Sequence, residues 1–270
     1  MLGDEFMRNA FIAGGGIALA AGLVGYFVVL RNQVFATDAL GHVAFTGGLA
    51  GALAGIPLLP SVFVTSILGA VAIGSLGGRG RGRDVAIGTI FSWVLGLGVL
   101  FLSIYTTLRS ARGGIVGVSV LFGSILTLEP DAARAAAIAG LLSSAVLLFV
   151  CRPLLFATLD PDVATARGVP VRQVTLVFLA LVGATVAEAV QAVGALLIFG
   201  LMVTPAAIAQ SATSRPYHGL ALSALLSLLF VWTGVFMAYY LPYPPSFLVV
   251  AISSATYLAA ATLRRLRATT

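Results

Sequence analysis

The sequence predicts an all-α membrane protein, a polytopic helical bundle of about eight or nine transmembrane helices that forms one domain over residues 1–270. Two features of the composition support this. Hydrophobic residues make up 60% of the chain and charged residues only 9%, against about 25% charged residues in soluble domains. The mean hydropathy is +1.09. In addition, apolar runs long enough to cross a bilayer core of about 30 Å recur along the chain with short connections.

Each apolar run of about 20 residues is a candidate membrane span. The pattern predicts nine spans, at residues 10–30, 37–56, 60–76, 85–107, 132–150, 172–190, 193–211, 218–240 and 246–263. The run at 114–128 is shorter, starts at glycine and ends at Glu129-Pro130, which is typical of a re-entrant or interfacial segment. Eight or ten crossings remain open.

The distribution of arginine predicts the orientation of the bundle. All fifteen basic residues are arginine, and cytoplasmic loops carry the excess of positive charge in inner-membrane proteins. With nine crossings, eleven arginines share a side with the C-terminus, and the other side has four: Arg8, Arg109, Arg112 and Arg134. We therefore expect a multi-pass protein of the bacterial inner membrane, with an outer N-terminus and a cytoplasmic C-terminus.

The composition also excludes several kinds of function. The chain has no lysine and hence no GxxxxGK[ST] phosphate-binding loop, so it is not an ATPase, and any ATP it uses is hydrolysed by another subunit. Cys151 is the only cysteine, which excludes an internal disulfide and a CxxC motif. Basic segments with interleaved aromatic residues are missing outside the apolar runs, which argues against nucleic-acid binding. Glycine spacings such as GGGIALAAG predict close helix packing.

Two ionisable side chains stand four residues apart inside an apolar run. In the stretch ATDALGHVAF, Asp38 and His42 share one face of a helix. An Asp at membrane depth costs about 2.5–3.5 kcal/mol on insertion scales, so we expect it to have a function. A carboxylate and an imidazole form half of a tetrahedral divalent-metal site, and two copies of the chain would complete it. The alternative is a hydrogen bond between the two side chains that only orients packing.

The depth of this pair depends on where its helix begins. Thr37 is expected to lie near the helix start, with a polar cap. The pair would then lie in the first turns, close to the cytoplasmic half, unless the preceding loop is drawn into the membrane.

A second apolar run carries further candidates for the pathway, Glu188 and Gln191. A glutamate near the outer end of a span is more typical of an interfacial residue than of a metal ligand, and we expect the interfacial position for Glu188.

The polar loop FATLDPDVATARGVPVRQV (156–174) differs from the other connections. Asp160, followed by proline at the first helical position, predicts a short surface helix that is ended by Gly168 and Pro170. On the predicted cytoplasmic face this helix could receive a partner protein. The alternative is an ordinary connecting helix.

Four stretches in order resemble the ABC-3 permeases, the membrane subunits of ABC-type importers for zinc, manganese or iron. GYFVVLRNQVFATDALGHVAFTG (25–47) is similar to the family pattern of a glycine, an apolar run, Leu-Arg and then Asp-Ala-Leu-Ser-His-Ala. The other three are LFGSIL (121–126), LDPDVATARGVPV (159–171) and QAVGALLIFGLMVTPAAIA (191–209).

The resemblance implies a homodimeric permease in a lipid membrane, with cytoplasmic ATP-binding subunits below it and an extracytoplasmic metal-binding protein outside. Asp38 and His42 would bind the transported ion, zinc by first expectation and otherwise manganese or iron, and no cofactor would stay bound. Gly41 stands where the family commonly has Ser, which removes a hydroxyl beside His42. The coupling helix, within the loop near 156–172, would offer the ATPase Asp160, Pro161, Asp162, Ala164, Arg167 and Gly168.

Three other functions remain open. A permease for a metal chelate such as a siderophore or cobalamin would need no metal ligands in its path. A secondary cation transporter would need more intramembrane acids than Asp38 and Glu188, and it leaves the 156–174 loop unexplained. A structural membrane scaffold predicts that deleting residues 160–168 changes no transport.

Overall fold

The computed structural model describes residues 4–75, 81–108, 123, 125–195 and 198–269, and these residues form helices and no strand. The predicted all-α fold is therefore confirmed. The α-helices are α1 Glu5–Leu30, α2 Val34–Ala54, α3 Leu58–Ser75, α4 Arg81–Leu108, α6 Pro130–Leu159, α7 Pro161–Ala166, α8 Val171–Val193, α9 Thr204–Ala212, α10 Pro216–Tyr240 and α11 Pro245–Thr269. Two short turns accompany them, the 3-10 helix η1 Ile125–Thr127 and the π-helix η3 Phe199–Val203. The expected outer segment at 114–128 lies largely outside the described residues.

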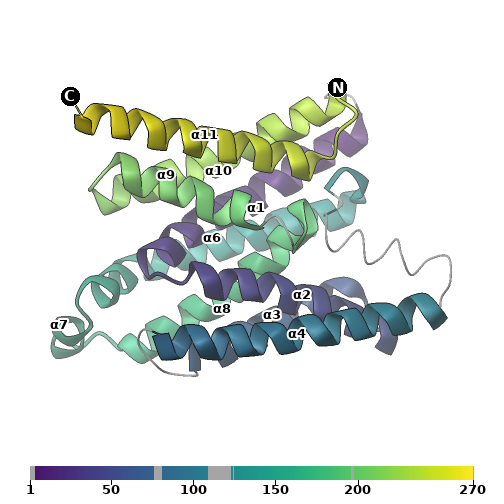
Figure 1. Cartoon of the computed structure of the whole chain (residues 1–270), viewed down its shortest axis with the longest axis horizontal. Coiled ribbons are helices and arrows are strands. Elements are labelled where there is room, and N and C mark those ends of the chain that lie inside the picture. The colour runs from purple at the N-terminus through teal and green to yellow at the C-terminus, as the bar shows by residue number, and fades with distance from the viewer. Residues whose placement is uncertain (1–3, 76–80, 109–122, 124, 196–197, 270) are drawn as a thin grey trace.

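Within the described residues, six helices are long and apolar enough to cross a membrane: Glu5–Leu30, Asp84–Leu108, Pro130–Leu159, Val171–Val190, Pro216–Tyr240 and Pro245–Leu266. Two apolar helices are shorter, Leu58–Gly74 and Phe199–Ala212. Each of the nine predicted runs contains a helix, whereas the number of crossings stays a prediction. The chain ends lie at opposite ends of the bundle, and α7 lies at the end that holds the C-terminus (Figure 1).

Helix α1 forms the centre of the bundle. It packs on α6 and α10, and also on α8, α9 and η3. A Cβ atom added at Gly16 would lie 2.7 Å from the Cα atom of Ala137, and one added at Gly22 would lie 2.7 Å from that of Ala224. The glycines of the GGGIALAAG stretch therefore let helix backbones touch, which confirms the packing predicted for them.

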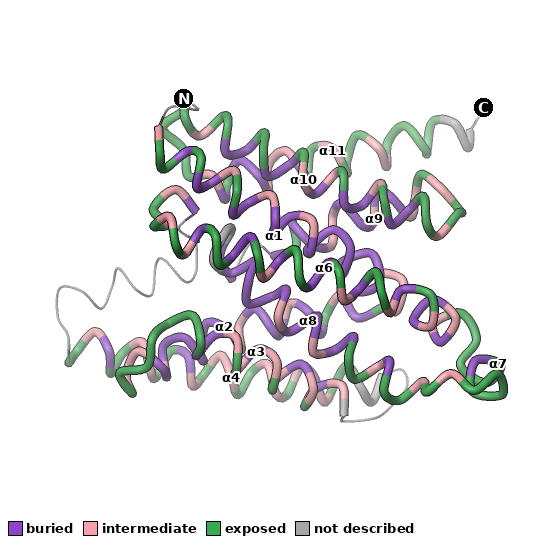
Figure 2. The backbone as a smooth tube through the Cα atoms, turned by 180° about the vertical axis from the view of Figure 1, so that it is seen from behind, coloured by how far each residue is buried: buried purple, intermediate pink, exposed green. Residues whose placement is uncertain are grey.

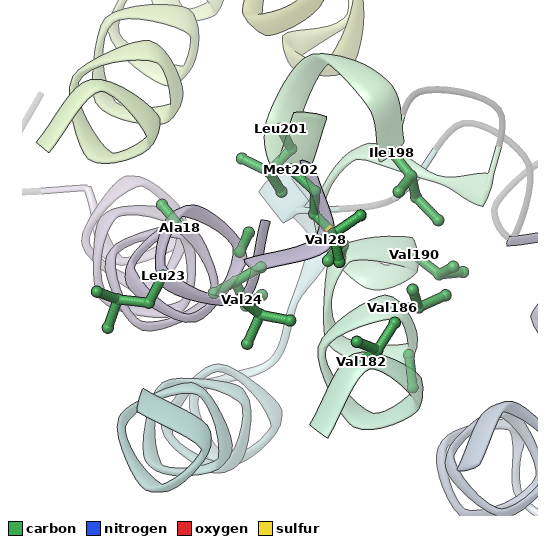
Figure 3. Packing of buried hydrophobic residues seen from close by; sticks show 14 of the residues in the cluster. Ala18, Leu23, Val24, Val28, Val182, Val186, Val190, Ile198, Leu201 and Met202 are labelled. Atoms are coloured by element: carbon green, nitrogen blue, oxygen red, sulfur yellow. The ribbon is translucent and has the colours of Figure 1, made fainter. Parts of the chain in front are cut away.

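Apolar side chains fill the space around α1. Val24 and Val28 of α1 lie near Val182 and Val186 of α8 and Met202 of η3 (Figure 3), and all five are buried. Burial is continuous along much of α1, whereas α4 and α11 show exposed positions along their length (Figure 2). Because many of the exposed side chains on α4 are large and apolar, we expect this helix to face lipid or a second protein.

Helices α2, α3, α4 and α8 form the other side of the bundle. Helix α2 packs on α3 and α4, and α3 packs on α8. Although α1 and α2 follow each other in the chain, they touch only slightly. Helix α8 contacts α1, α2, α3 and α6, so it connects the two sides.

Candidate metal site

Helix α2 begins at Val34, three residues earlier than the sequence indicated. Gln33 precedes the helix, and its side chain makes no capping hydrogen bond. The Thr37 hydroxyl donates to the Gln33 carbonyl one turn back, at 3.1 Å. The predicted cap at Thr37 is therefore wrong: α1 ends in a tight turn that leads directly into α2, and Thr37 already lies within the first turn.

Asp38 and His42 occupy one face of α2, as their spacing predicts. Both side chains are half-buried, and they lie close enough to interact electrostatically. The described part of the chain offers neither of them a hydrogen bond or an ion pair. The alternative in which the two side chains satisfy each other by a hydrogen bond is therefore not what the structure shows.

Helix α4 holds the histidine ring from one side. The ring centroids of His42 and Phe91 lie 4.9 Å apart with an interplanar angle of 77°, an edge-to-face arrangement. Phe35 approaches the same Phe91 ring at 6.3 Å, and the Thr46 hydroxyl donates to the Val94 carbonyl at 2.9 Å. Aromatic contacts of this kind orient a ring without a hydrogen bond. The contact with Phe91 thus orients the imidazole ring of His42.

The pair lies beside the interior of a neighbouring helix and not beside its end. Phe91 comes ten residues after Arg81, the first residue of α4, which is about 15 Å along the helix axis at 1.5 Å per residue. At the other side, the turn before α2 contacts Thr175, which is four residues or about 6 Å into α8. The turn before α2 therefore packs against α8, whereas the depth of the pair in the membrane stays a prediction.

Close packing explains the glycine between the two ionisable residues. A Cβ atom at Gly41 would lie 2.9 Å from the carbonyl oxygen of Ala195 and 2.9 Å from Cδ1 of Ile198. Sequence reasoning noted only the missing serine hydroxyl and did not foresee this contact, because residues 195 and 198 are far away in the chain. The sequence did offer one indication of a close helix contact, a glycine inside a predicted helix directly beside His42.

One chain would supply only part of a metal site. Among the described residues, no group of three or more His, Cys, Asp and Glu side chains lies together. As metal ligands, Asp38 and His42 would provide two groups, whereas zinc sites use four and manganese favours more oxygen-rich, octahedral sets. The remaining ligands would have to come from a second copy of the chain, a partner or water.

Glu188 lies apart from this pair and is fully buried. Its Oε1 accepts a hydrogen bond of 2.9 Å from the Ser143 hydroxyl of α6, and its Oε2 has no partner among the described residues. Helix α8 thus turns this residue toward α6 inside the bundle, and its position relative to the membrane surface stays a prediction. The side chain of Gln191 lies outside the described residues, and a pathway role for either residue stays a prediction.

The short helix predicted in the polar loop is confirmed as α7. Asp160 caps it by accepting a hydrogen bond from the Val163 amide at 3.0 Å, with Pro161 at the first position. Gly168, at φ +79°, ends the turn. Ala164 is fully buried and anchors the helix, so it offers a partner no surface. The other predicted contact residues are exposed: Asp160, Pro161, Asp162, Arg167 and Gly168.

A cleft of about 500 Å³ adjoins α7. It lies between the end of α6, the α7–α8 connection and the start of α10, and its lining includes Arg152, Phe156, Leu159, Val169 and Tyr217. This end of the bundle thus presents a protruding helix beside an apolar concave surface.

The family model of the ABC 3 transport family matches residues 3–264. ScaB, a manganese import system permease protein of Streptococcus parasanguinis, is 30% identical over 94% of this chain and 89% of its own length. MntD, a manganese transport system membrane protein of Bacillus subtilis, is also 30% identical, over 90% of this chain and 87% of its own. The solved structure of PsaBC from Streptococcus pneumoniae in complex with Fab has a similar fold, with a TM-score of 0.82 and 24% identity, and the match covers 95% of this chain and 91% of that one.

Proposed function

We propose, from the premise that this chain belongs to the ABC 3 transport family, that it forms the membrane path of an ATP-driven importer for divalent transition-metal ions. It is a membrane permease and not itself an ATPase. Manganese is the ion we favour, because two relatives at 30% identity are named for manganese. Zinc is the second candidate, since carboxylate and imidazole ligands serve both ions.

One observation carries the proposal: Asp38 and His42 are half-buried on one face of α2 without a hydrogen-bonding partner among the described residues. Ionisable groups in a membrane span are costly and are normally paired or placed in a polar path. A passing divalent cation would compensate both side chains at once. The edge-to-face contact with Phe91 supports this, because it orients the imidazole ring.

Two copies of the chain would complete the site. Each contributes one carboxylate and one imidazole, so a symmetric dimer offers four ligands to a single ion. We expect one bound ion for two chains. The ion must also leave again, so the site has to bind it weakly enough for release.

The two ends of the bundle would receive different partners. From the arginine distribution, we expect the C-terminal end, where α7 also lies, on the cytoplasmic side. An ATP-binding subunit would contact α7 and the adjoining cleft there. An extracytoplasmic binding protein would deliver the ion at the opposite end, and ATP hydrolysis would switch the side on which the path is open.

Uptake by the whole transporter, reconstituted in vesicles with its ATP-binding subunit and binding protein, tests the proposal. We expect ATP-dependent entry of Mn²⁺ that Asp38→Asn or His42→Ala lowers by more than about 100-fold, since even residues that only support a metal ligand are worth about 10–100-fold in affinity. The chain offers matched controls: His218, its only other histidine, and Asp84 are both exposed. His218→Ala and Asp84→Asn should transport at the wild-type rate.

Each alternative predicts a different result. Unchanged Mn²⁺ and Zn²⁺ uptake in both pair variants would remove the pair from the mechanism. Uptake of a metal chelate without uptake of the free ion would support a chelate permease. Transport that needs an ion gradient but no ATP would support a secondary transporter, and no transport with any partner would support a scaffold.

A further inference from the structure

We propose that Arg31 is a positioning residue that passes a movement of α7 on to the Asp38–His42 pair. The inference rests on the proposed import function, because it concerns how ATP hydrolysis at one end of the bundle reaches the metal site. It depends on a continuous series of contacts from α7 through α8 and Arg31 to the start of α2.

The first step joins α7 to α8. The Gly168 amide donates to the Thr165 carbonyl at 2.9 Å, and the Val169 amide donates to the Ala164 carbonyl at 3.0 Å. Ala164 is itself fully buried. The Val171 amide, at the start of α8, in turn donates to the Val169 carbonyl at 2.8 Å. Because these hydrogen bonds continue from α7 into α8 and a buried residue anchors α7, the short helix and the first turns of α8 are expected to move as one piece.

The second step joins α8 to the end of α1. An Nη2 hydrogen of Arg31 is donated to the Thr175 hydroxyl at 3.2 Å, and the guanidinium carbon lies 5.1 Å from the centre of the Phe178 ring. The two α8 residues are three apart, so they lie on the same face of the helix. Phe27 of α1 approaches the same Phe178 ring edge-to-face at 6.2 Å. A planar guanidinium can make a hydrogen bond and stack on an aromatic face together, which a lysine ammonium cannot reproduce.

The third step joins Arg31 to the pair. Asn32 has a φ of +54°, and the Gln33 amide donates to the Val28 carbonyl at 2.8 Å, which is the Schellman arrangement at the end of α1. The Gln33 carbonyl then accepts from both the amide and the hydroxyl of Thr37, at 3.0 and 3.1 Å. Thr37 is followed directly by Asp38. The segment from Arg31 to the metal ligands therefore contains no flexible link.

The weak contact between α1 and α2 makes this turn important. Beyond this turn, α1 and α2 make few contacts with each other. The N-terminal end of α2 therefore takes its position from the turn and from its neighbours α3, α4 and α8. A shift of the first turns of α8 would act on Arg31 and, through the rigid turn, would tilt the face that bears Asp38 and His42.

The ratio of Mn²⁺ ions transported to ATP molecules hydrolysed tests the inference in the reconstituted transporter. We expect Arg31→Gln to keep ATP hydrolysis while that ratio falls about five-fold or more, the lower end of typical coupling between sites. The ratio should fall less in Arg31→Lys, which keeps the charge, and in Thr175→Val, which removes the hydroxyl acceptor. Arg134→Gln is the control, because Arg134 is 70% exposed and pairs with Asp131 of its own helix at 3.6 Å. It should keep the wild-type ratio.

Several outcomes separate the possibilities. Mn²⁺ binding by the Arg31 variants in detergent should stay at the wild-type level, because the ligands are intact, and a loss of binding would make Arg31 a structural residue only. If Arg31→Gln fails to fold, the transport ratios of Arg31→Lys and Thr175→Val test the inference in its place. A wild-type ratio in all folded variants would overturn the inference while the import function stands. A wild-type transporter that moves no Mn²⁺ with ATP would instead overturn the proposed function.

Discussion

Replacing Gly25 with alanine should destabilise the bundle strongly. Gly25 is the glycine of the stretch GYFVVLRNQ, and it lies against the π-helical turn η3. A Cβ atom there would overlap the carbonyl oxygen of Met202 and would lie 2.8 Å from the carbonyl carbon and 3.2 Å from the Cα atom of that residue. The clash is with backbone, and Met202 is fully buried, so no flexible side chain can move aside.

The size of the effect follows from this geometry. Relief of the overlap requires α1 and η3 to separate by about 1 Å, and a gap of that size removes up to about half of the dispersion energy between the facing atoms. Overpacking of a core costs about 1–3 kcal/mol, and this case belongs at the upper end. Alanine also has a higher helix propensity than glycine, which offsets about 1 kcal/mol of this cost. We therefore expect a net loss of about 2 kcal/mol in the free energy of unfolding.

Gly96→Ala on α4 is the matched control, because a Cβ atom at Gly96 meets nothing within 4 Å. This variant should gain about 0.5–1 kcal/mol. The two variants should thus differ by about 3 kcal/mol, or about 6–12 °C in melting temperature for a chain of this size. The assay is the fraction of purified protein that stays monodisperse in detergent after heating. Equal melting temperatures of Gly25→Ala and the wild type would refute the role assigned to the close approach.

Two further substitutions test other parts of the structure. Ser143→Ala should lower the free energy of unfolding by about 1–3 kcal/mol, because the buried carboxyl group of Glu188 would lose the donor that lies 2.9 Å away. The neighbouring Ser144→Ala loses only a bond within its own helix and should matter less in the same thermal assay; an equal loss in both would contradict this account. Asp160→Ala should destabilise α7 by about 0.5–2 kcal/mol, since it removes the cap on the Val163 amide. Faster proteolysis of the 156–174 loop would report this change, and unaltered cleavage would speak against the cap.

The candidate site was predictable in part because its residues are close in the chain. The spacing of Asp38 and His42 fixes their common face on any helix. In the same way, Asp160-Pro161 and Gly168 define the start and end of α7 by purely local rules. The Thr37 cap failed because the end of α1 determines where α2 begins, and the sequence around residue 37 alone does not contain that information.

Burial could not be predicted in the same way. Glu188 has the local surroundings of an interfacial residue, yet Ser143, which binds it, lies 45 residues earlier in the chain. The partner of Arg31 on α8 is 144 residues away. Which side chain faces which neighbour depends on the relative rotation and depth of packed helices, and hydropathy does not distinguish one apolar neighbour from another.

The sequence by itself determined that the chain is a helical membrane protein, that an acid and an imidazole share one helix face, and that a capped surface helix interrupts the bundle. These features follow from composition, from the 3.6-residue period and from local capping. Only the tertiary structure decided the contact of His42 with Phe91, the enclosure of Glu188, the close approach at Gly41 and the contacts of Arg31. Each of these arises where helices distant in sequence come within a few ångströms of one another.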